Sequence, residues 1–307
     1  MRVIFDCDPG VDDGVALLLA FASPEIDLLG VTTVAGNVSA SLTARNACIV
    51  REIADRESVP VIAGCTRPLV REPVEAGHFH GESGLGSLPI FAPRCGPEPG
   101  HAVEFLIETL RDAAPREITL VITGPMTNVA AALQSQPSIT ASIRQIVVMG
   151  GARSEGGNIT ASAEYNVYAD PHAAKVVADS GCPLVMFGLD VTHQVRATPA
   201  RIAGLRALGT RRALAAAELL QFSTDLPENG PRELGSPLHD PCPVAWLLAP
   251  EAFEFRSCYL DIETQSRLTL GHTAVEFRAR PERAMHVRWG VRADAARVFD
   301  LLAARLA

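Results

Sequence analysis

The feature of this sequence that most constrains its fold is a regular alternation of short apolar runs with longer helical patterns. The apolar runs are rich in β-branched residues and predict strands at residues 3–5, 28–34, 59–63, 118–123, 146–149, 184–187, 258–262 and 284–289. Helical patterns occupy residues 13–22, 39–54, 102–111, 127–133, 171–180, 199–208, 211–222 and 294–306. This order predicts a mostly parallel sheet, and the nearly continuous apolar character of the strands predicts helices on both faces.

The length of the chain and its even composition predict a single domain. A chain of 307 residues can bury one large core, and neither an internal repeat nor a linker interrupts it. We therefore expect one α/β domain over residues 1–307 with a Rossmann-like central sheet. Residues 66–100 and 223–243 are rich in Gly and Pro and too long for ordinary connections. Such loops often form lids or binding loops, although a surface insertion explains either one equally well.

Charge and cysteine content exclude several classes of partner. The formal net charge of -8 should repel a phosphate backbone, so nucleic acid is not expected. The seven cysteines are far apart and form no C-x-x-C pair, which argues against a disulfide framework or a zinc site. Residues 1–5 lead straight into a strand without a signal peptide, and the longest apolar run, residues 15–22, is too short to span a bilayer. We expect a soluble cytoplasmic protein without membrane contact.

Polar residues and glycines directly follow five of the predicted strands. They occupy residues 6–13, 35–37, 123–128, 150–151 and 188–190. The carboxyl ends of parallel strands meet at one edge of a sheet, and ligands of open α/β sheets bind beyond that edge. Glycine lets the backbone approach a ligand closely. The sequence therefore predicts an active site at the carboxyl ends of the strands.

Four carboxylates follow the first strand within eight residues: Asp6, Asp8, Asp12 and Asp13. A single Asp here could cap the next helix or interact with its dipole, but capping cannot use all four. Like charges this close raise one another's pKa unless a cation lies among them. Asp8 and Asp13 face each other across a Pro-Gly turn, which suits a hard divalent cation with oxygen ligands. The spacing is not that of an EF-hand.

Two further polar clusters are candidates, although each could be ordinary surface structure. Asn158, Glu164 and Asn166 lie in a segment, residues 156–170, that we expect to be irregular. His239 and Asp240 follow a stretch rich in Gly and Pro. Neither cluster identifies an activity by itself.

At these residues the chain resembles the inosine-uridine preferring nucleoside hydrolase family. Residues 6–16, DCDPGVDDGVA, are similar to the family signature D-x-D-P-G-x-D-D-x-x-A. The resemblance continues in the family's order through VAGN at 34–37, HGESG at 80–84, TGPMTN at 123–128, MGG at 149–151, AEYN at 163–166, GLDVT at 188–192 and HD at 239–240. It covers about the first four fifths of the chain, and residues after 251 carry no recognised motif.

The resemblance implies hydrolysis of the N-glycosidic bond of ribonucleosides, purine or pyrimidine, with a calcium-bound water. The implied Ca²⁺ ligands are the carboxylates of Asp8, Asp13 and Asp240 and the main-chain oxygen of Thr123, with the ribose hydroxyls and water completing the shell. The residues implied to bind the ribose are Asp12, Asn37, Asn158, Glu164 and Asn166. Asp6 would support the metal-binding loop. The resemblance also implies a homo-oligomer.

The implied chemistry gives catalytic roles to Asp8, His239 and His80. Bond cleavage passes through a ribosyl cation, and Asp8 would accept the proton of the attacking water. A neutral nucleobase leaves poorly unless it is protonated. His239 is the candidate acid because an imidazole titrates near neutral pH, and His80 is the competing candidate. We expect the loops at 77–86 and 223–235 to close over the nucleoside.

Departures from the family pattern leave the base preference open. Residues 223–235 lack the aromatic side chains that often line the base pocket in relatives. His239 stands where the branch that stacks purines between tryptophans has Trp, so that branch is disfavoured. Tyr165 replaces a Phe that many relatives have, which is a mild change.

Two alternative functions remain at this point. A D-x-D strand end also occurs in haloacid-dehalogenase-like phosphatases, which use the Asp as a covalent nucleophile with magnesium. Such enzymes need a cation for the phosphate, and the only lysine, Lys175, lies in a predicted helix without that context. The second alternative is a calcium-held ribonucleoside-binding protein without turnover.

Overall fold

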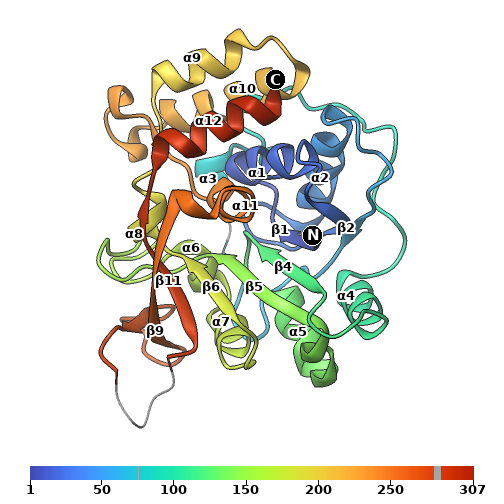
Figure 1. Ribbon diagram of the computed structural model, residues 1–307, viewed down its shortest axis with the longest axis vertical. Helices are drawn as coiled ribbons and strands as arrows, with labels where there is room; N and C mark the ends of the chain where they lie inside the picture. Colours follow the sequence, from blue (N-terminus) through green and yellow to red (C-terminus); the bar gives the residue numbers. More distant parts are fainter. Residues whose placement is uncertain (75, 280–284) are drawn as a thin grey trace.

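A nine-stranded sheet forms the centre of the computed structural model, which describes residues 1–74, 76–279 and 285–307 (Figure 1). The strands lie in the order β10-β9-β11-β6-β5-β4-β1-β2-β3. Their bounds are β1 Arg2–Cys7, β2 Asp27–Thr33, β3 Val61–Ala63, β4 Ile118–Ile122, β5 Ile143–Met149, β6 Leu184–Phe187, β9 Phe253–Ile262, β10 Thr273–Glu276 and β11 Val287–Ala293. Strands β1 to β6 and β11 pair in parallel, whereas β9 and β10 are antiparallel. The predicted mostly parallel sheet is confirmed.

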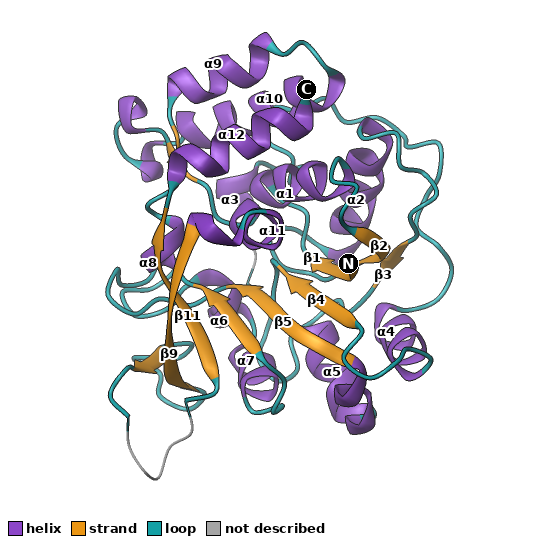
Figure 2. Ribbon diagram, in the orientation of Figure 1, coloured by secondary structure: helices purple, strands orange, loops and turns teal. Residues whose placement is uncertain are grey.

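Helices cover both faces of this sheet because alternate strand residues point to opposite sides. In β1, Val3 and Phe5 pack into one apolar core and Ile4 into the other. The first core is covered by α1 (Val11–Phe21), α2 (Ala40–Ile53), α10 (Arg211–Asp225), α11 (Pro241–Leu248) and α12 (Ala295–Leu306), with α9 (Pro199–Ala207) beside α10. The second is covered by α4 (Ala102–Arg111), α5 (Thr127–Ser135) and α7 (Pro171–Ala178) (Figure 2).

Several predicted boundaries are wrong. Residues 156–170 are not irregular throughout, because α6 (Tyr165–Ala169) lies within them. Strand β9 begins at residue 253 rather than 258, since exposed charged side chains alternate with its first apolar ones. The predicted strand 284–289 corresponds to β11, and residue 284 lies outside the described residues. Strand β10 was not predicted.

The remaining elements are short. They are α3 (Gly77–His80), α8 (Leu189–Thr192), the β7–β8 pair (Arg196–Ala197 and Ser236–Pro237) and 3-10 turns at Pro137–Ser142, Pro227–Asn229, Arg232–Leu234 and Pro250–Ala252. No helix in the described part of the chain is long and apolar enough to cross a membrane.

The strand register brings the predicted site segments to one edge of the sheet. Asp6 of β1 lies between Thr32 of β2 and Ile122 of β4, and Met149 of β5 pairs with Phe187 of β6. The polar segments that follow these strands therefore begin side by side, as the sequence predicts.

Candidate active site

A cavity of about 650 Å³ lies at this edge of the sheet. Nine of the residues singled out from the sequence line it: Asp12, Asn37, His80, Thr123, Asn158, Glu164, Asn166, His239 and Asp240. Asp8 and Asp13 do not line the cavity and are fully buried. The structure therefore gathers residues from across the chain at one place, with two of the carboxylates beneath its surface.

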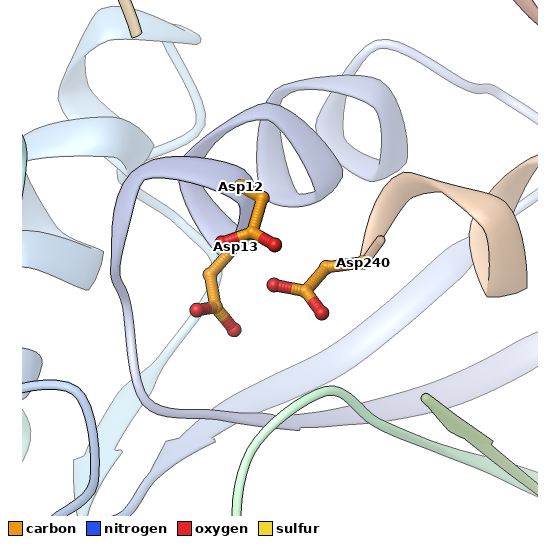
Figure 3. A group of neighbouring side chains, drawn as sticks. All are labelled: Asp12, Asp13 and Asp240. Carbon is orange, nitrogen blue, oxygen red and sulfur yellow. The ribbon is translucent and has the colours of Figure 1, made fainter. Parts of the chain in front are cut away.

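Three carboxylates point toward one another beside the cavity (Figure 3). Asp12 and Asp13 come from the first turn of α1, and Asp240 directly precedes α11. One oxygen atom from each lies within 4.8 Å of the others. The negative charge of Asp12 disfavours the charged forms of Asp13 and Asp240, so a cation among the three would stabilise the arrangement.

Asp8 lies next to this group in a tightly enclosed position. Its Oδ2 atom accepts the backbone N–H of Asn37 at 2.7 Å. Its Oδ1 atom is buried without a hydrogen-bond partner among the described residues. A Cβ atom added to Gly36 would lie 2.0 Å from Oδ2, and one added to Gly124 would lie 2.6 Å from Oδ1. Two glycine backbones thus enclose a carboxylate that has an unused acceptor atom.

Asp13 is held by groups that follow three different strands. Its Oδ1 atom accepts the hydroxyl of Thr123 at 2.7 Å, and its Oδ2 atom accepts the N–H of Gly10 at 3.0 Å. The side-chain amide of Asn37 donates to Oδ2 of Asp13 at 3.1 Å and to the carbonyl oxygen of Asp8 at 3.0 Å. Asn37, expected from the sequence to bind ribose, therefore also fixes two carboxylates.

Burial makes ionisation of these carboxylates costly. It raises the pKa of Asp8 and of Asp240 well above the usual range, and the neighbouring negative charges of Asp13 on Asp8 and of Asp12 on Asp240 raise both further. Burial, and then the charge of Asp12, raises the pKa of Asp13 to about 7. Together with the carbonyl oxygen of Thr123, these groups form a set of hard oxygen donors. Such donors and such unfavourable charges fit a hard divalent cation.

Asp6, in β1, accepts hydrogen bonds that stabilise the same edge of the sheet. Its Oδ1 atom accepts the hydroxyl of Thr32 at 2.5 Å and the amide of Asn128 at 2.8 Å. Asn128 also donates to the carbonyl oxygen of Thr33 at 3.0 Å and accepts the N–H of Cys65 at 2.8 Å. Asp6 thereby links β1 to β2 and to α5.

A second wall of the cavity is built around α6. Glu164 caps this helix, and its carboxylate accepts three backbone N–H groups, from Gly151, Asn166 and Val167. Burial raises the pKa of Glu164 although these hydrogen bonds lower it. The amide of Asn166 donates to the carbonyl oxygen of Thr123 at 2.7 Å, and Asn158 accepts the N–H of Tyr165 at 2.9 Å. The three predicted ribose-binding residues thus form a hydrogen-bonded wall.

The two candidate histidines have different partners. Nδ1 of His80 accepts the backbone N–H of Val11 at 3.1 Å, and Nδ1 of His239 lies 2.9 Å from the hydroxyl of Thr192. Burial lowers the pKa of His239 to about 4, although the negative charge of Asp12 acts in the opposite direction. The value differs from the near-neutral titration expected from the sequence. Without ligands the His239 ring is therefore uncharged at pH 7.

The outer wall of the cavity includes part of the loop 223–235 that the sequence predicts, but its individual residues were not predicted. His193, Arg196, Ser223 and Asn229 line it, and no motif spacing marks them. Arg196 donates to the carbonyl oxygen of Asn229 at 3.0 Å and to that of Gly235 at 2.6 Å. It thereby fastens residues 229–235 to β7.

Lys175 lies outside the cavity. Its ammonium group pairs with Asp261 at 2.8 Å and with Asp179 at 3.2 Å, and the residue does not line the cavity. Lys175, the residue that could supply the cation of a phosphatase site, is therefore paired with carboxylates at the surface.

Comparison with known proteins identifies relatives over the whole chain. The family model of the inosine-uridine preferring nucleoside hydrolases matches residues 3–300. The chain is 42% identical over 307 residues to the pyrimidine-specific ribonucleoside hydrolase RihA of Salmonella agona, covering 100% of this chain and 98% of the relative. An uncharacterized protein of Schizosaccharomyces pombe is 47% identical over 277 residues, which cover 90% of this chain and 89% of that protein. The solved structure of a purine-preferring ribonucleoside hydrolase from Gardnerella vaginalis has a TM-score of 0.92 at 31% identity, covering 100% of this chain and 98% of that one.

Proposed function

Because this chain belongs to the inosine-uridine preferring nucleoside hydrolase family, we propose that it hydrolyses the N-glycosidic bond of pyrimidine ribonucleosides to free base and ribose. The observation that carries the proposal is the placement of buried carboxylates beside a cavity with a hydrogen-bonded polar wall. The choice of pyrimidines rests on the relative named pyrimidine-specific, which is 42% identical, against 31% for the purine-preferring hydrolase.

The lining of the cavity supports this choice. The aromatic and imidazole rings along it, among the described residues, are those of Phe79, Tyr165, His80, His193 and His239, without a tryptophan. A site that stacks a purine between tryptophans is not formed here. The histidines and polar groups along the cavity would instead hold a pyrimidine base by hydrogen bonds.

We propose that the metal bound at these carboxylates is Ca²⁺, a hard cation that takes oxygen ligands. We infer that Asp8, Asp13, Asp240 and the carbonyl oxygen of Thr123 hold it, because Oδ1 of Asp8 is buried without a partner among the described residues. When bound, Ca²⁺ would polarise a water molecule and neutralise the carboxylates. Homo-oligomerisation and a cytoplasmic location, which the family resemblance and the sequence suggest, remain predictions.

The ribose would lie between the carboxylates and the α6 wall. Asp12, Asn37, Asn158, Glu164 and Asn166 line this part of the cavity and would hold the ribose hydroxyls. Carboxylates aimed at the sugar also stabilise the positive charge that develops as the bond breaks. Substrates without the 2′-hydroxyl would leave buried acceptors unpaired and should be cleaved poorly.

The proposed reaction needs one proton acceptor and one donor. The water oxygen forms a bond to C1′, and the bond from C1′ to the base nitrogen breaks with its electron pair going to the base. Asp8 takes a proton from the water, and His239, uncharged in the ligand-free site, takes up a proton from solvent when the nucleoside binds and gives it to the base. Asp8 then returns its proton to solvent, so that nucleoside and water become ribose and free base.

Chromatography of the products tests this function. We expect release of uracil and cytosine from uridine and cytidine, slower release of bases from inosine, adenosine and guanosine, and little from the 2′-deoxy forms. Phosphate release from p-nitrophenyl phosphate without base release would support the phosphatase alternative. Nucleoside binding in a calorimeter without base release would support the binding protein instead, and either result contradicts the proposal.

A further inference from the structure

The partner of each candidate histidine restricts what that histidine can do. The Nδ1 atom of His80 accepts the backbone N–H of Val11 at 3.1 Å. A backbone N–H can only donate, so Nδ1 must carry a lone pair and the proton of the neutral ring lies on Nε2. A second proton on Nδ1 would break this hydrogen bond. The start of α1 thus fixes the tautomer of the His80 ring, with the ring proton on Nε2.

His239 has a partner of a different kind. The hydroxyl of Thr192 lies 2.9 Å from its Nδ1 atom. A hydroxyl both donates and accepts, so it can donate to a bare Nδ1 and accept from a protonated one. Rotation of one O–H bond is enough to change between these states. The Thr192 hydroxyl can therefore keep its hydrogen bond to the His239 ring both before and after the ring transfers a proton.

The surroundings fix the orientation of the His239 ring. Thr192 is fully buried in α8 and does not line the cavity, whereas His239 does. The Nδ1 atom is therefore bonded to a residue behind the cavity lining, which leaves Nε2 as the ring nitrogen available to the cavity. The ring centre of His193 lies 5.7 Å from that of His239, and the carbonyl oxygen of His239 accepts the N–H of Cys242 at 3.1 Å.

We propose that Thr192 is a positioning residue that presents Nε2 of His239 to the departing base, while His80 serves as a fixed neutral hydrogen-bond donor. This inference rests on the proposed function, because it concerns how the base leaves. The charged and titratable groups nearest His239 are Asp12, His80, His193, Arg196 and the adjacent Asp240. None of them holds Nδ1, which leaves that task to Thr192.

Two substrates and two substitutions at Thr192 test the proposal. Thr192→Val removes the hydroxyl at nearly constant volume and should lower kcat on uridine by about 10–10²-fold, with KM little changed. This loss is smaller than the roughly 10²–10⁴-fold that a general acid contributes, because the imidazole itself remains. p-Nitrophenyl riboside has an activated leaving group and should be cleaved at nearly the wild-type rate. Thr192→Ser keeps the hydroxyl and should restore most of the uridine activity. Thr192→Val combined with His239→Ala should be no slower than His239→Ala alone.

The control is Thr43→Val, which removes another buried hydroxyl, bonded to the carbonyl oxygen of Ala40 in α2. It should leave both substrates unaffected. An equal loss on uridine and p-nitrophenyl riboside in Thr192→Val, or failure of serine to restore activity, would overturn the positioning role. If the valine variant does not fold by circular dichroism, Thr192→Ala replaces it with the same expectations.

Imidazole ¹⁵N chemical shifts give a readout that does not depend on turnover. We expect Thr192→Val to move the Nδ1 shift of His239, assigned through its loss in His239→Ala, and to leave that of His80 in place. Unchanged His239 shifts would overturn the proposal. If the wild-type protein cleaves no ribonucleoside, the proposed function fails, and the shifts still decide whether Thr192 holds the ring.

Discussion

Asp8 and Asn37, which lie 29 positions apart in the chain, are joined by two hydrogen bonds that use different parts of each residue. The backbone N–H of Asn37 donates to the carboxylate of Asp8, and its side-chain amide donates to the carbonyl oxygen of Asp8. The same amide reaches Asp13. Asn37, in the segment that follows β2, therefore sets the relative position of Asp8 and Asp13, which are two of the proposed metal ligands.

Asn37→Ala tests this relationship. The substitution removes the side-chain amide and keeps the backbone N–H, so Asp8 and Asp13 lose a shared donor. Removal of such a supporting group typically lowers metal affinity about 10–100-fold, and we expect a loss of that size for Ca²⁺ by titration calorimetry. Gln136→Ala, which removes an exposed amide, is the control. A Kd equal to that of the wild type in Asn37→Ala would show that Asn37 does not position the ligands.

Gly36→Ala should damage the site through the carboxylate of Asp8. The new Cβ would lie 2.0 Å from Oδ2 of Asp8, so the carboxylate must move. A displacement of about 1 Å can cost on the order of 10²-fold in rate, and we expect kcat on uridine to fall by at least that factor. Gly204→Ala is the control, because nothing lies within 4 Å of its added Cβ in the exposed part of α9. Wild-type turnover in folded Gly36→Ala would contradict this account of Asp8.

The sequence predicts the inner half of the site better than the outer half. Asp8 and Asp13 flank a strand-to-helix turn, so local order alone brings them together, and parallel strands bring Thr123 to the same edge. Arg196 and Asn229 meet only through the packing of β7 and the loop after α10. No local pattern records such a contact, so the sequence predicts the loop 223–235 but neither Arg196 nor the residues of the loop that it holds.

The difference between local sequence patterns and tertiary contacts also explains the errors in the predicted secondary structure. Helix α6 is too short for a helical repeat to show, and its cap is Glu164 rather than the Ser, Thr, Asp or Asn that usually marks a helix start. Strand β10 is a short edge strand defined by its pairing with β9. Tertiary contacts decide both elements.

The stability of the metal-free protein should fall as pH rises. The pKa of Asp6 and of Asp13 is about 7 in the folded protein, against an ordinary value near 4. Between these values the folded state binds more protons than the unfolded state, so the free energy of unfolding decreases with increasing pH. We expect the Tm of the metal-free protein to fall between pH 5 and 7.

Calcium should reverse this effect, and most strongly where the carboxylates are charged. We expect Ca²⁺ to raise the Tm more at pH 8 than at pH 5, measured by calorimetry. Asp13→Asn cannot ionise and should show a shallower fall of Tm with pH in the metal-free state. A Ca²⁺-induced shift that is the same at both pH values would argue against binding by these carboxylates.

Arg196→Lys should loosen the outer wall. Lysine cannot reproduce the fork by which Arg196 holds the carbonyl oxygens of Asn229 and Gly235. A hydrogen bond to a charged group contributes about 1.5–3 kcal/mol, so we expect KM for uridine to rise by roughly tenfold or more with a smaller change in kcat. Arg292→Lys, in an exposed ion pair with Glu254, is the control. An unchanged KM would remove Arg196 from substrate binding.

The loops at 77–86 and 223–235 should close over the bound nucleoside. Both contribute residues to the cavity, among them His80 and Asn229. We expect each loop to gain protection from hydrogen exchange when a ribose-like inhibitor binds, and Arg196→Lys to reduce that gain in the second loop. Exchange that is the same with and without the inhibitor would show that neither loop is a lid.

The most direct test of the account is the rate of uracil release from uridine before and after exhaustive removal of metal, confirmed by elemental analysis. The buried carboxylates of Asp8, Asp13 and Asp240 need a cation to act together, so we expect turnover to fall to background without metal and to return when Ca²⁺ alone is added. Asp8→Ala should remain folded and show no recovery. Full turnover in the metal-free protein, or turnover in Asp8→Ala equal to that of the wild type, would contradict the central claim.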